Sequence, residues 1–219
     1  MKCFLLFLIL LMLGVGETPA QRASVRPLAP DPFAPVTDVP GLPRVLLIGD
    51  SISMGYTAPV QKLLEGKANV HRIPQNGGST RTGIEKIEEW IGASKWDVIH
   101  FNWGLHDLMF NPALQRDPAQ YEKDQLALYE KNLRVLVARL KETGAKLVWA
   151  TSTPVADEMS SPRSPSHRAA TVKIYNDVAA KIMAENGVAI DDLNAYAAPR
   201  TKQRALNCHP ERNEGSSTT

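Results

Sequence analysis

The sequence predicts an α/β fold, a three-layer α/β/α sandwich on a five-stranded parallel sheet of the flavodoxin-like type. Short apolar segments alternate with segments in which apolar residues recur every three or four positions, the pattern of strands alternating with helices. A length of 219 residues suits one domain with a sizeable core. No Gly-x-Gly-x-x-Gly motif follows the first predicted strand, which disfavours a dinucleotide-binding fold.

Five short apolar segments are expected to form the strands. The first, residues 44–48, ends in Val-Leu-Leu-Ile, a continuous apolar run typical of a strand buried on both faces. The other four are expected at residues 70–73, 97–103, 146–150 and 188–190. Because helical segments separate the strands, right-handed crossovers would make all of them parallel.

Four helices are expected between these strands. The first covers residues 57–64 and carries Pro59 in its first turn, where proline is tolerated. Gly144 is expected to end the third helix, and Gly187 is expected to end the fourth, at residues 168–185. The apolar stripes of the last three helices are Ile84, Ile87 and Ile91; Leu126, Tyr129, Leu133, Leu136 and Leu140; and Val172, Tyr175, Ala179 and Ile182.

Residues 1–20 have the pattern of a secretory signal peptide. Lys2 precedes an unbroken apolar run at residues 4–13, and the small residues Thr18 and Ala20 follow it. The run is too short to span a bilayer, which takes about 20 apolar residues in a helix. We therefore expect a secreted or periplasmic protein with no stable membrane span once the leader is removed. An uncleaved membrane anchor is the alternative.

The segments that flank the domain differ from it in composition. Residues 21–43 contain six prolines, which block helices and disfavour central strands, so an extended linker is expected. A wall-anchoring stalk is the alternative. The domain is expected at residues 44–209. Residues 210–219 have no apolar periodicity and are expected to be a disordered, truncated or frame-shifted tail.

Charge and cysteine content narrow the class of protein. The net charge is +2 and no dense basic run occurs, so a nucleic-acid partner is not expected. The two cysteines are Cys3 and Cys208, and Cys3 would leave with the leader. One remaining cysteine cannot form an intramolecular disulfide, so the fold must depend on its core.

Polar, glycine-rich clusters follow four of the predicted strands. They are Gly49-Asp50-Ser51, Gly77-Gly78, residues 104–107 and residues 151–153. The carboxyl ends of parallel strands meet at one edge of the sheet, where α/β proteins bind their ligands. Each cluster alone is also compatible with an ordinary turn, and Asp50 or Ser51 with a helix cap. Together they favour a functional site at this edge.

These clusters resemble the sequence blocks of the SGNH (GDSL) hydrolase family. The first block is matched by Gly49-Asp50-Ser51, which implies that Ser51 is the nucleophile. The second is matched by residues 76–80, which implies that the Gly78 N–H binds the oxyanion. The third, usually Gly-x-Asn-Asp, here reads Gly-Leu-His-Asp, with His106 in the place of asparagine.

The last block of the family, Asp-x-x-His, is matched by residues 206–209. His209 is present and would be the catalytic base, but Leu206 stands where the acid is expected. The candidate supporting carboxylates elsewhere are Asp50, Asp107, Asp191 and Asp192. A main-chain carbonyl that holds the imidazole is the alternative to a carboxylate.

The chemistry of a serine esterase requires these residue types. A serine hydroxyl becomes a good nucleophile when a base removes its proton, and histidine does this near neutral pH. The oxyanion needs fixed donors, here the N–H groups of Ser51 and Gly78 and a ring N–H of His106. His106 as a base, or as a metal ligand with Asp107, is the alternative. The remaining histidines, His71, His100 and His167, are expected to have structural or solvated positions.

The resemblance implies a serine esterase that cleaves small acyl esters, such as O-acetyl groups on carbohydrate. It implies no metal and no cofactor, and a small-molecule or carbohydrate ester as the substrate. The alternative is a non-catalytic ligand- or glycan-binding module on the same fold, suggested by His106 and Leu206. A flavin-binding protein is a further alternative of the same fold class.

Overall fold

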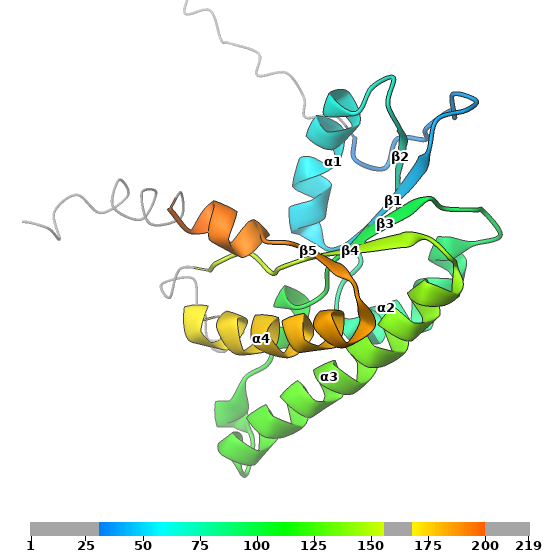
Figure 1. Ribbon diagram of the computed structural model, residues 1–219. Coiled ribbons are helices and arrows are strands. Elements are labelled where there is room, and N and C mark those ends of the chain that lie inside the picture. The colour runs from blue at the N-terminus through cyan, green and yellow to red at the C-terminus, as the bar shows by residue number, and fades with distance from the viewer. Residues whose placement is uncertain (1–30, 156–167, 200–219) are drawn as a thin grey trace, which may run out of the picture. The chain divides into compact units, whose positions relative to one another are not determined.

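Five parallel strands lie side by side in the part of the chain that the structure describes, in the order β2-β1-β3-β4-β5 (Figure 1). The structure is a computed structural model, and it describes residues 31–155 and 168–199. The strand order is that of flavodoxin-like folds, as predicted. The strands are β1 (Arg44–Ile48), β2 (Asn69–Arg72), β3 (Val98–Phe101), β4 (Lys146–Ala150) and β5 (Ala189–Asp191).

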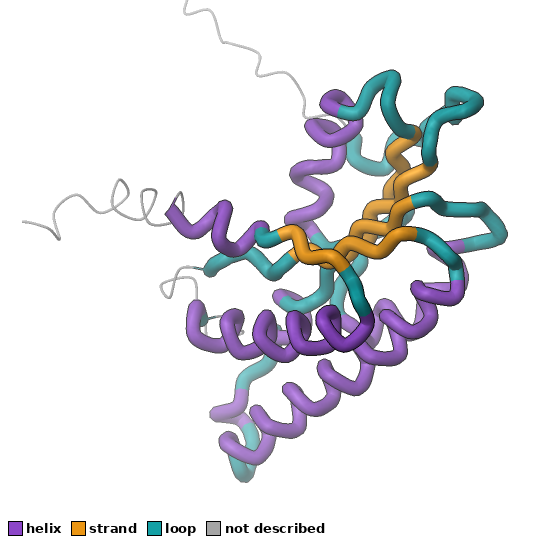
Figure 2. The backbone as a smooth tube through the Cα atoms, viewed as in Figure 1, coloured by secondary structure: helices purple, strands orange, loops and turns teal. Residues whose placement is uncertain are grey.

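Helices cover both faces of the sheet, so the predicted three-layer architecture is confirmed. Helix α1 lies on one side of the sheet, and α2, α3 and α4 lie on the other (Figures 1 and 2). A further helix begins after β5 and is described over residues 193–199. The helices are α1 (Ser51–Leu63), α2 (Thr80–Ile91), α3 (Pro118–Glu142) and α4 (Ala169–Asn186), with short 3₁₀ helices η1 (Leu105–Leu108) and η2 (Pro112–Leu114).

The core lies between the sheet and the α2–α4 layer. Leu46, Leu47 and Ile48 of β1 are buried, as the apolar run predicts. The stripes of α3 and α4 are also buried, except for Leu126, which is partly buried at the edge of the core. Burial of these side chains is the main contribution that stabilises the fold.

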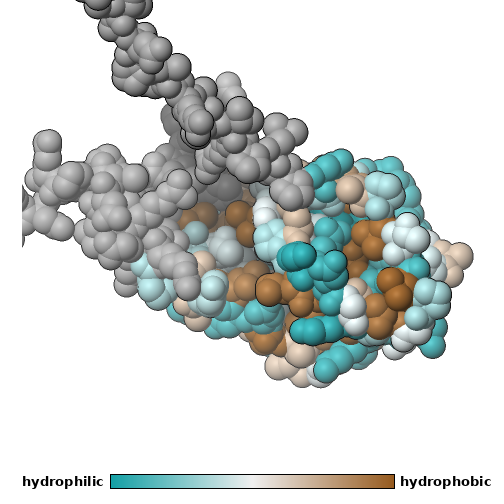
Figure 3. All heavy atoms as spheres, turned by 90° about the horizontal axis from the view of Figure 1, so that it is seen from above, coloured by the Kyte–Doolittle hydropathy of each residue, from teal (hydrophilic) through white to brown (hydrophobic). Residues whose placement is uncertain are grey.

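The face of the sheet under α1 has a second apolar surface. Figure 3 views the molecule from above and shows hydrophobic residues among hydrophilic ones on the part of that side that the structure describes. A cavity of about 380 Å³ lies on this face. Most of its lining residues are apolar: Val45, Leu47, Val60, Leu64, Val98, Val148 and Leu193, with Tyr56, His100 and Asp191.

Helix α1 begins six residues earlier than predicted, at Ser51 and not at Thr57. The Asp50 side chain caps it by accepting a hydrogen bond from the Ile52 N–H at 2.9 Å. Pro59 therefore lies inside the helix and not in its first turn. It has no N–H to donate to the carbonyl of Gly55.

The predicted stripe of α2 is wrong at one position. Ile84 is 40% exposed, whereas Ile87 and Ile91 are buried as expected. The residue that faces the core at this level is Gly83, because a Cβ atom there would lie 2.9 Å from the ring of Trp103. Close packing of α2 against Trp103 thus sets the orientation of the helix.

Residues 31–43, expected to be part of an extended linker, contact the domain although they form no helix or strand. Asn69 holds this segment: its side chain accepts from the Val39 N–H at 2.8 Å and donates to the Val39 carbonyl at 3.0 Å. Asp38 forms ion pairs with Arg44 at 2.8 Å and His71 at 2.6 Å. The segment therefore packs along the β2 edge of the sheet.

Several predictions concern residues outside the described ranges. These are the signal peptide at residues 1–20, the first part of the linker at residues 21–30, the last block at residues 206–209 with Cys208 and His209, the tail at residues 210–219, and the position of His167. Within the described ranges, none of the helices is long and apolar enough to cross a membrane.

Candidate active site

Ser51 is the first residue of α1 and directly follows β1 and the Gly49-Asp50 turn. Its side chain is exposed, whereas Asp50 is 4% exposed because its carboxylate caps the helix. The hydroxyl of Ser53 donates to the Asp50 carbonyl at 2.7 Å. The capping role predicted for Asp50 or Ser51 thus belongs to Asp50. Ser51 remains at a helix N-terminus, where free N–H groups favour negative charge.

The second block packs directly against the first through Gly77. Its N–H donates to the Gly49 carbonyl at 2.9 Å. A Cβ atom at position 77 would lie 2.7 Å from that same carbonyl oxygen, so a side chain does not fit there. This close approach explains the glycine at this position.

Gly78, the predicted oxyanion donor, has a φ of 57°, in the left-handed region that glycine adopts without strain. Its N–H donates to the Asn76 side-chain oxygen at 2.9 Å. An oxyanion at this N–H would therefore share or displace the Asn76 contact. In the chain, Gly78 lies between Gly77, which contacts the first block, and Thr80, which contacts the third.

The third block follows β3 and forms η1. A side chain at Gly104 would collide with Ser152, so the block is held close to the end of β4. His106 is half-buried and lines a cavity of about 120 Å³ together with Ser79 and Arg81. His106 thus lies beside Ser79 of the second block, and the lining of this cavity includes neither Ser51 nor Gly78.

Asp107 joins the third block to the start of α2. Its carboxylate accepts from the Thr80 N–H at 3.0 Å and from the Thr80 hydroxyl at 2.6 Å. Burial raises the pKa of Asp107 from 3.8 to about 6, although the hydrogen bonds from Thr80 act in the opposite direction. The carboxylate also lies at the N-terminus of α2, where the helix dipole favours its charge.

Trp103 provides a second connection between the second and third blocks. Its indole N–H donates to the Gly77 carbonyl at 3.3 Å, and its own carbonyl accepts from the Tyr129 hydroxyl at 3.1 Å. The chain is therefore fixed on both sides of Gly78 and Ser79, at Gly77 by Trp103 and at Thr80 by Asp107. The Gly77 contact with Gly49 extends this connection to the first block.

Asp191 and Asp192 lie at the end of β5, three strands from β1. At about 4.8 Å per strand this is a distance of about 14 Å across the sheet. The Asp191 carboxylate pairs with His100 at 3.1 Å. Asp192 accepts from the Thr151 hydroxyl and the Ala195 N–H, both at 3.0 Å, and so caps the helix at residues 193–199. Each carboxylate therefore has a structural contact.

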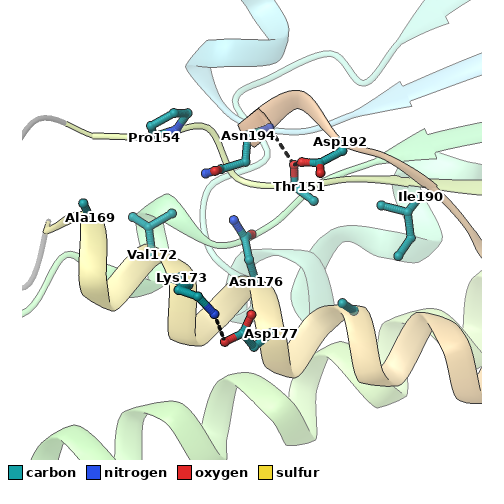
Figure 4. A pocket seen from close by; sticks show the side chains of 11 residues that line it. Thr151, Pro154, Ala169, Val172, Lys173, Asn176, Asp177, Ile190, Asp192 and Asn194 are labelled. Atoms are coloured by element: carbon teal, nitrogen blue, oxygen red, sulfur yellow. Dashed lines mark hydrogen bonds and ion pairs between the residues drawn. The ribbon is translucent and has the colours of Figure 1, made fainter. Parts of the chain in front are cut away.

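Asp192 and Thr151 also line a cavity of about 330 Å³ between the ends of β4 and β5 and helix α4 (Figure 4). Asn176 and Asn194 contribute amide groups, and both donate to the Ser152 carbonyl, at 2.9 and 2.8 Å. This cavity is distinct from the one beside His106. Among the described residues, no group of three or more His, Cys, Asp or Glu side chains could hold a metal ion.

One residue near Ser51 has no counterpart among the predicted site residues. Arg72 ends β2 and donates to the carbonyls of Gly49 and Asp50, at 3.0 and 3.1 Å. A charged residue at the carboxyl end of a predicted strand was the available sequence signal. The Arg72 side chain reaches the residues before Ser51 because β2 pairs with β1, and the sequence does not show this pairing.

Comparisons with known proteins agree with this geometry. The model of the GDSL-like Lipase/Acylhydrolase family matches residues 47–213, a range that includes Ser51, Gly78, His106 and His209. No curated protein sequence matches the chain.

Solved structures with the same fold include two acetyl xylan esterases. AlAXEase has a TM-score of 0.56 and 15% identity over 73% of this chain and 84% of its own. Axe2 from Geobacillus stearothermophilus has a TM-score of 0.52 and 23% identity over 70% and 77%.

A lipase/acylhydrolase from Enterococcus faecalis is also similar, with a TM-score of 0.57 and 19% identity over 74% of this chain and 82% of its own. These likenesses agree with the fold. The family match covers most of the chain and contains the serine block at the end of β1. The chain therefore belongs to the GDSL-like lipase/acylhydrolase family and is a hydrolase of ester bonds.

Proposed function

We propose that this protein is a secreted or periplasmic serine esterase that removes small acyl groups, such as O-acetyl groups on carbohydrate. The observation that supports it most strongly is the direct contact between the three sequence blocks. Gly77 bonds to Gly49, and Asp107 bonds to Thr80. An exposed serine, a left-handed glycine turn and a half-buried histidine are thereby held at one edge of the sheet.

In the proposed reaction, the Ser51 oxygen attacks the ester carbonyl while His209 takes the hydroxyl proton. The carbonyl oxygen becomes an oxyanion, and the N–H groups of Ser51 and Gly78 and the ring N–H of His106 stabilise it. Collapse of this intermediate breaks the ester C–O bond, and His209 returns the proton to the leaving alcohol. Water then attacks the acyl-enzyme in the same way, releases the acid and restores Ser51.

A cavity of about 120 Å³ lies beside His106, and its lining includes the polar side chains of Ser79, Arg81 and Gln125 but neither Ser51 nor Gly78. Its volume therefore does not set the size of the acyl group. The proposal of a small acyl group is supported by the shared fold with acetyl xylan esterases.

Two further observations support the substrate class and location. The acetyl xylan esterases named above share the fold, and acetylated carbohydrate is an expected substrate for an exported member of the family. The leader pattern at residues 1–20 supports export. Detection of the mature N-terminus in the culture medium or periplasm tests this part of the proposal.

Hydrolysis of p-nitrophenyl esters tests the activity. The wild-type protein should hydrolyse p-nitrophenyl acetate, with rates that fall from acetate to butyrate to octanoate, and should release acetate from acetylated xylan. Ser51→Ala should lose these activities. Equal rates for the wild type and Ser51→Ala would contradict the proposal and favour a non-catalytic binding module.

A further inference from the structure

Arg72 contacts the main chain just before Ser51. It is the last residue of β2, where it pairs with Leu47 of the neighbouring strand β1. One of its terminal nitrogens, Nη2, donates to the Gly49 carbonyl at 3.0 Å and to the Asp50 carbonyl at 3.1 Å. Hydrogen bonds from a charged donor are stronger than those between neutral groups. The guanidinium therefore holds both peptide groups that precede Ser51.

The two carbonyls that Arg72 holds also accept main-chain hydrogen bonds. The Gly49 carbonyl accepts the Gly77 N–H at 2.9 Å, and the Asp50 carbonyl accepts the Met54 N–H at 3.2 Å. The first of these bonds connects the first block to the second, and the second belongs to the first turn of α1. A shift of either carbonyl would therefore move Ser51 relative to the oxyanion donors.

The surroundings of Arg72 are unfavourable for a charged side chain. The side chain is half-buried, and its guanidinium lies 5.4 Å from the Phe33 ring. Burial lowers the pKa of Arg72, while the neighbouring Tyr56 and Asp50 act in the opposite direction. Its Nε and Nη1 atoms are buried and have no hydrogen-bond partner among the described residues. Such unpaired donors destabilise the folded protein.

We propose that Arg72 is a positioning residue for ester hydrolysis, which holds the Gly49-Asp50 peptides so that the Ser51 hydroxyl faces the carbonyl that it attacks. This inference rests on the proposed function of Ser51. Arg72 itself touches the peptide groups that precede Ser51 and takes no part in proton transfer. Its loss should therefore lower kcat more than it changes KM.

Arg44 provides a matched control within the same sheet. It is also a half-buried arginine, and its guanidinium lies 4.2 Å from the Trp96 ring. Like Arg72 it contacts the segment at residues 31–43, through its ion pair with Asp38 at 2.8 Å. It is, however, the first residue of β1, at the opposite end of the strand from Ser51. Loss of Arg44 should affect stability without changing the position of Ser51.

The kinetic test compares Arg72→Met, Arg72→Lys, Arg44→Met and Ser51→Ala with the wild type, using p-nitrophenyl acetate. Because a displacement of about 1 Å lowers rates by about 100-fold, kcat of Arg72→Met should fall by about that factor. KM should change by less than about threefold, as expected when an interaction acts in the transition state. Arg72→Lys should recover activity to within about tenfold of the wild type, since lysine keeps the charge without the planar donor group.

Arg44→Met should keep kcat within about twofold of the wild type, because it leaves the transition-state contacts intact. If Arg72→Met keeps the wild-type kcat, or if both methionine variants lose activity equally, the positioning role of Arg72 is wrong. If the wild type and Ser51→Ala have equal rates, the proposed function fails, and a measurement that needs no activity then decides whether Arg72 holds the two peptide groups that precede Ser51.

That measurement is amide hydrogen exchange at Gly77 and Met54. Their N–H groups bond to the carbonyls that Arg72 holds. Exchange at both amides should accelerate in Arg72→Met and stay at the wild-type rate in Arg44→Met. Unchanged exchange in Arg72→Met would overturn the inference even if the protein has no esterase activity.

Discussion

The Asp107 carboxylate accepts hydrogen bonds from both the N–H and the hydroxyl of Thr80, at 3.0 and 2.6 Å. Asp107 follows His106 directly, and Thr80 begins the helix that follows Gly78 and Ser79. This one pair of residues therefore fixes the spacing between two predicted oxyanion donors. It also holds the Asp107 carboxylate next to His106, close to the candidate site.

Removing the Thr80 hydroxyl should weaken this connection. In Thr80→Val, Asp107 loses its shortest hydrogen bond, and the Asn132 side chain loses the oxygen to which it donates at 3.2 Å. Leaving buried polar groups unpaired should lower the free energy of unfolding by about 1–3 kcal/mol. Urea denaturation at pH 7 measures this change. Thr80→Ser, which keeps the hydroxyl, should be closer to the wild type, and equal losses for both variants would contradict the role of the hydroxyl.

Stability should depend on pH through Asp107. Its pKa is raised from 3.8 to about 6 in the folded protein, so the folded state binds the proton more tightly than the unfolded state. As the pH rises from about 4 to about 6, the unfolded carboxyl ionises first, and this contribution to stability is lost, on the order of 2–3 kcal/mol.

Urea denaturation of the wild type and Asp107→Asn at pH 4, 5, 6 and 7 tests this dependence. The unfolding free energy of the wild type should fall relative to that of Asp107→Asn across the interval from pH 4 to 6, and the difference should then level off. A difference that is independent of pH would mean that Asp107 has an ordinary pKa.

Gly77 should tolerate no side chain. In Gly77→Ala the new Cβ would lie 2.7 Å from the Gly49 oxygen, so the second block must move away from the first. We expect a fall in kcat of about 100-fold, since small displacements of catalytic groups have effects of this size.

Gly55→Ala is the matched control for Gly77→Ala. Residue 55 lies between the ends of α1, and a Cβ atom there would have no atom within 4 Å. This variant should keep activity and gain about 0.5–1 kcal/mol of stability. Full activity of Gly77→Ala would contradict the close contact.

Substitutions of His106 should distinguish a donor from a base or a metal ligand. His106→Asn supplies an N–H donor at the same position and should keep activity. His106→Ala removes the donor, and loss of one oxyanion donor lowers kcat by about 100- to 1000-fold in other hydrolases. Comparison of kcat for the two variants with p-nitrophenyl acetate checks this. Equal inactivity of both would indicate that the imidazole itself is required.

The sequence predicted the ends of the five strands to within two residues, because short segments rich in apolar residues alternate along the chain with segments of helical periodicity. The first residue of a helix and the face that it buries were harder to predict. Helix α1 begins at Ser51 because Asp50 caps it, and no apolar periodicity marks that first turn. Ile84 was assigned to the core because its spacing fits a helix. The face that is buried depends on the contact of Gly83 with Trp103, which is a property of the folded structure.

The candidate site was predictable where a residue belongs to a block beside a strand end, as Ser51, Gly78 and His106 do. Arg72 was not predicted, since its contacts with Gly49 and Asp50 require the register of two neighbouring strands. The packing of residues 31–43 was missed for a similar reason. The prolines of residues 31–43 are consistent with the lack of helix in this segment, but the contacts of Asn69 with Val39 arise in the folded structure.

The central claim is that Ser51 is an activated nucleophile, and labelling with a fluorophosphonate probe tests it most directly. Ser53 is a control two residues away, since it is 2% exposed and its hydroxyl donates to the Asp50 carbonyl. Mass spectrometry of the labelled protein should locate one adduct on Ser51, present in Ser53→Ala and absent in Ser51→Ala and in the denatured protein. Absence of an adduct on Ser51 in the folded wild type, or the same labelling in Ser51→Ala, would contradict the account.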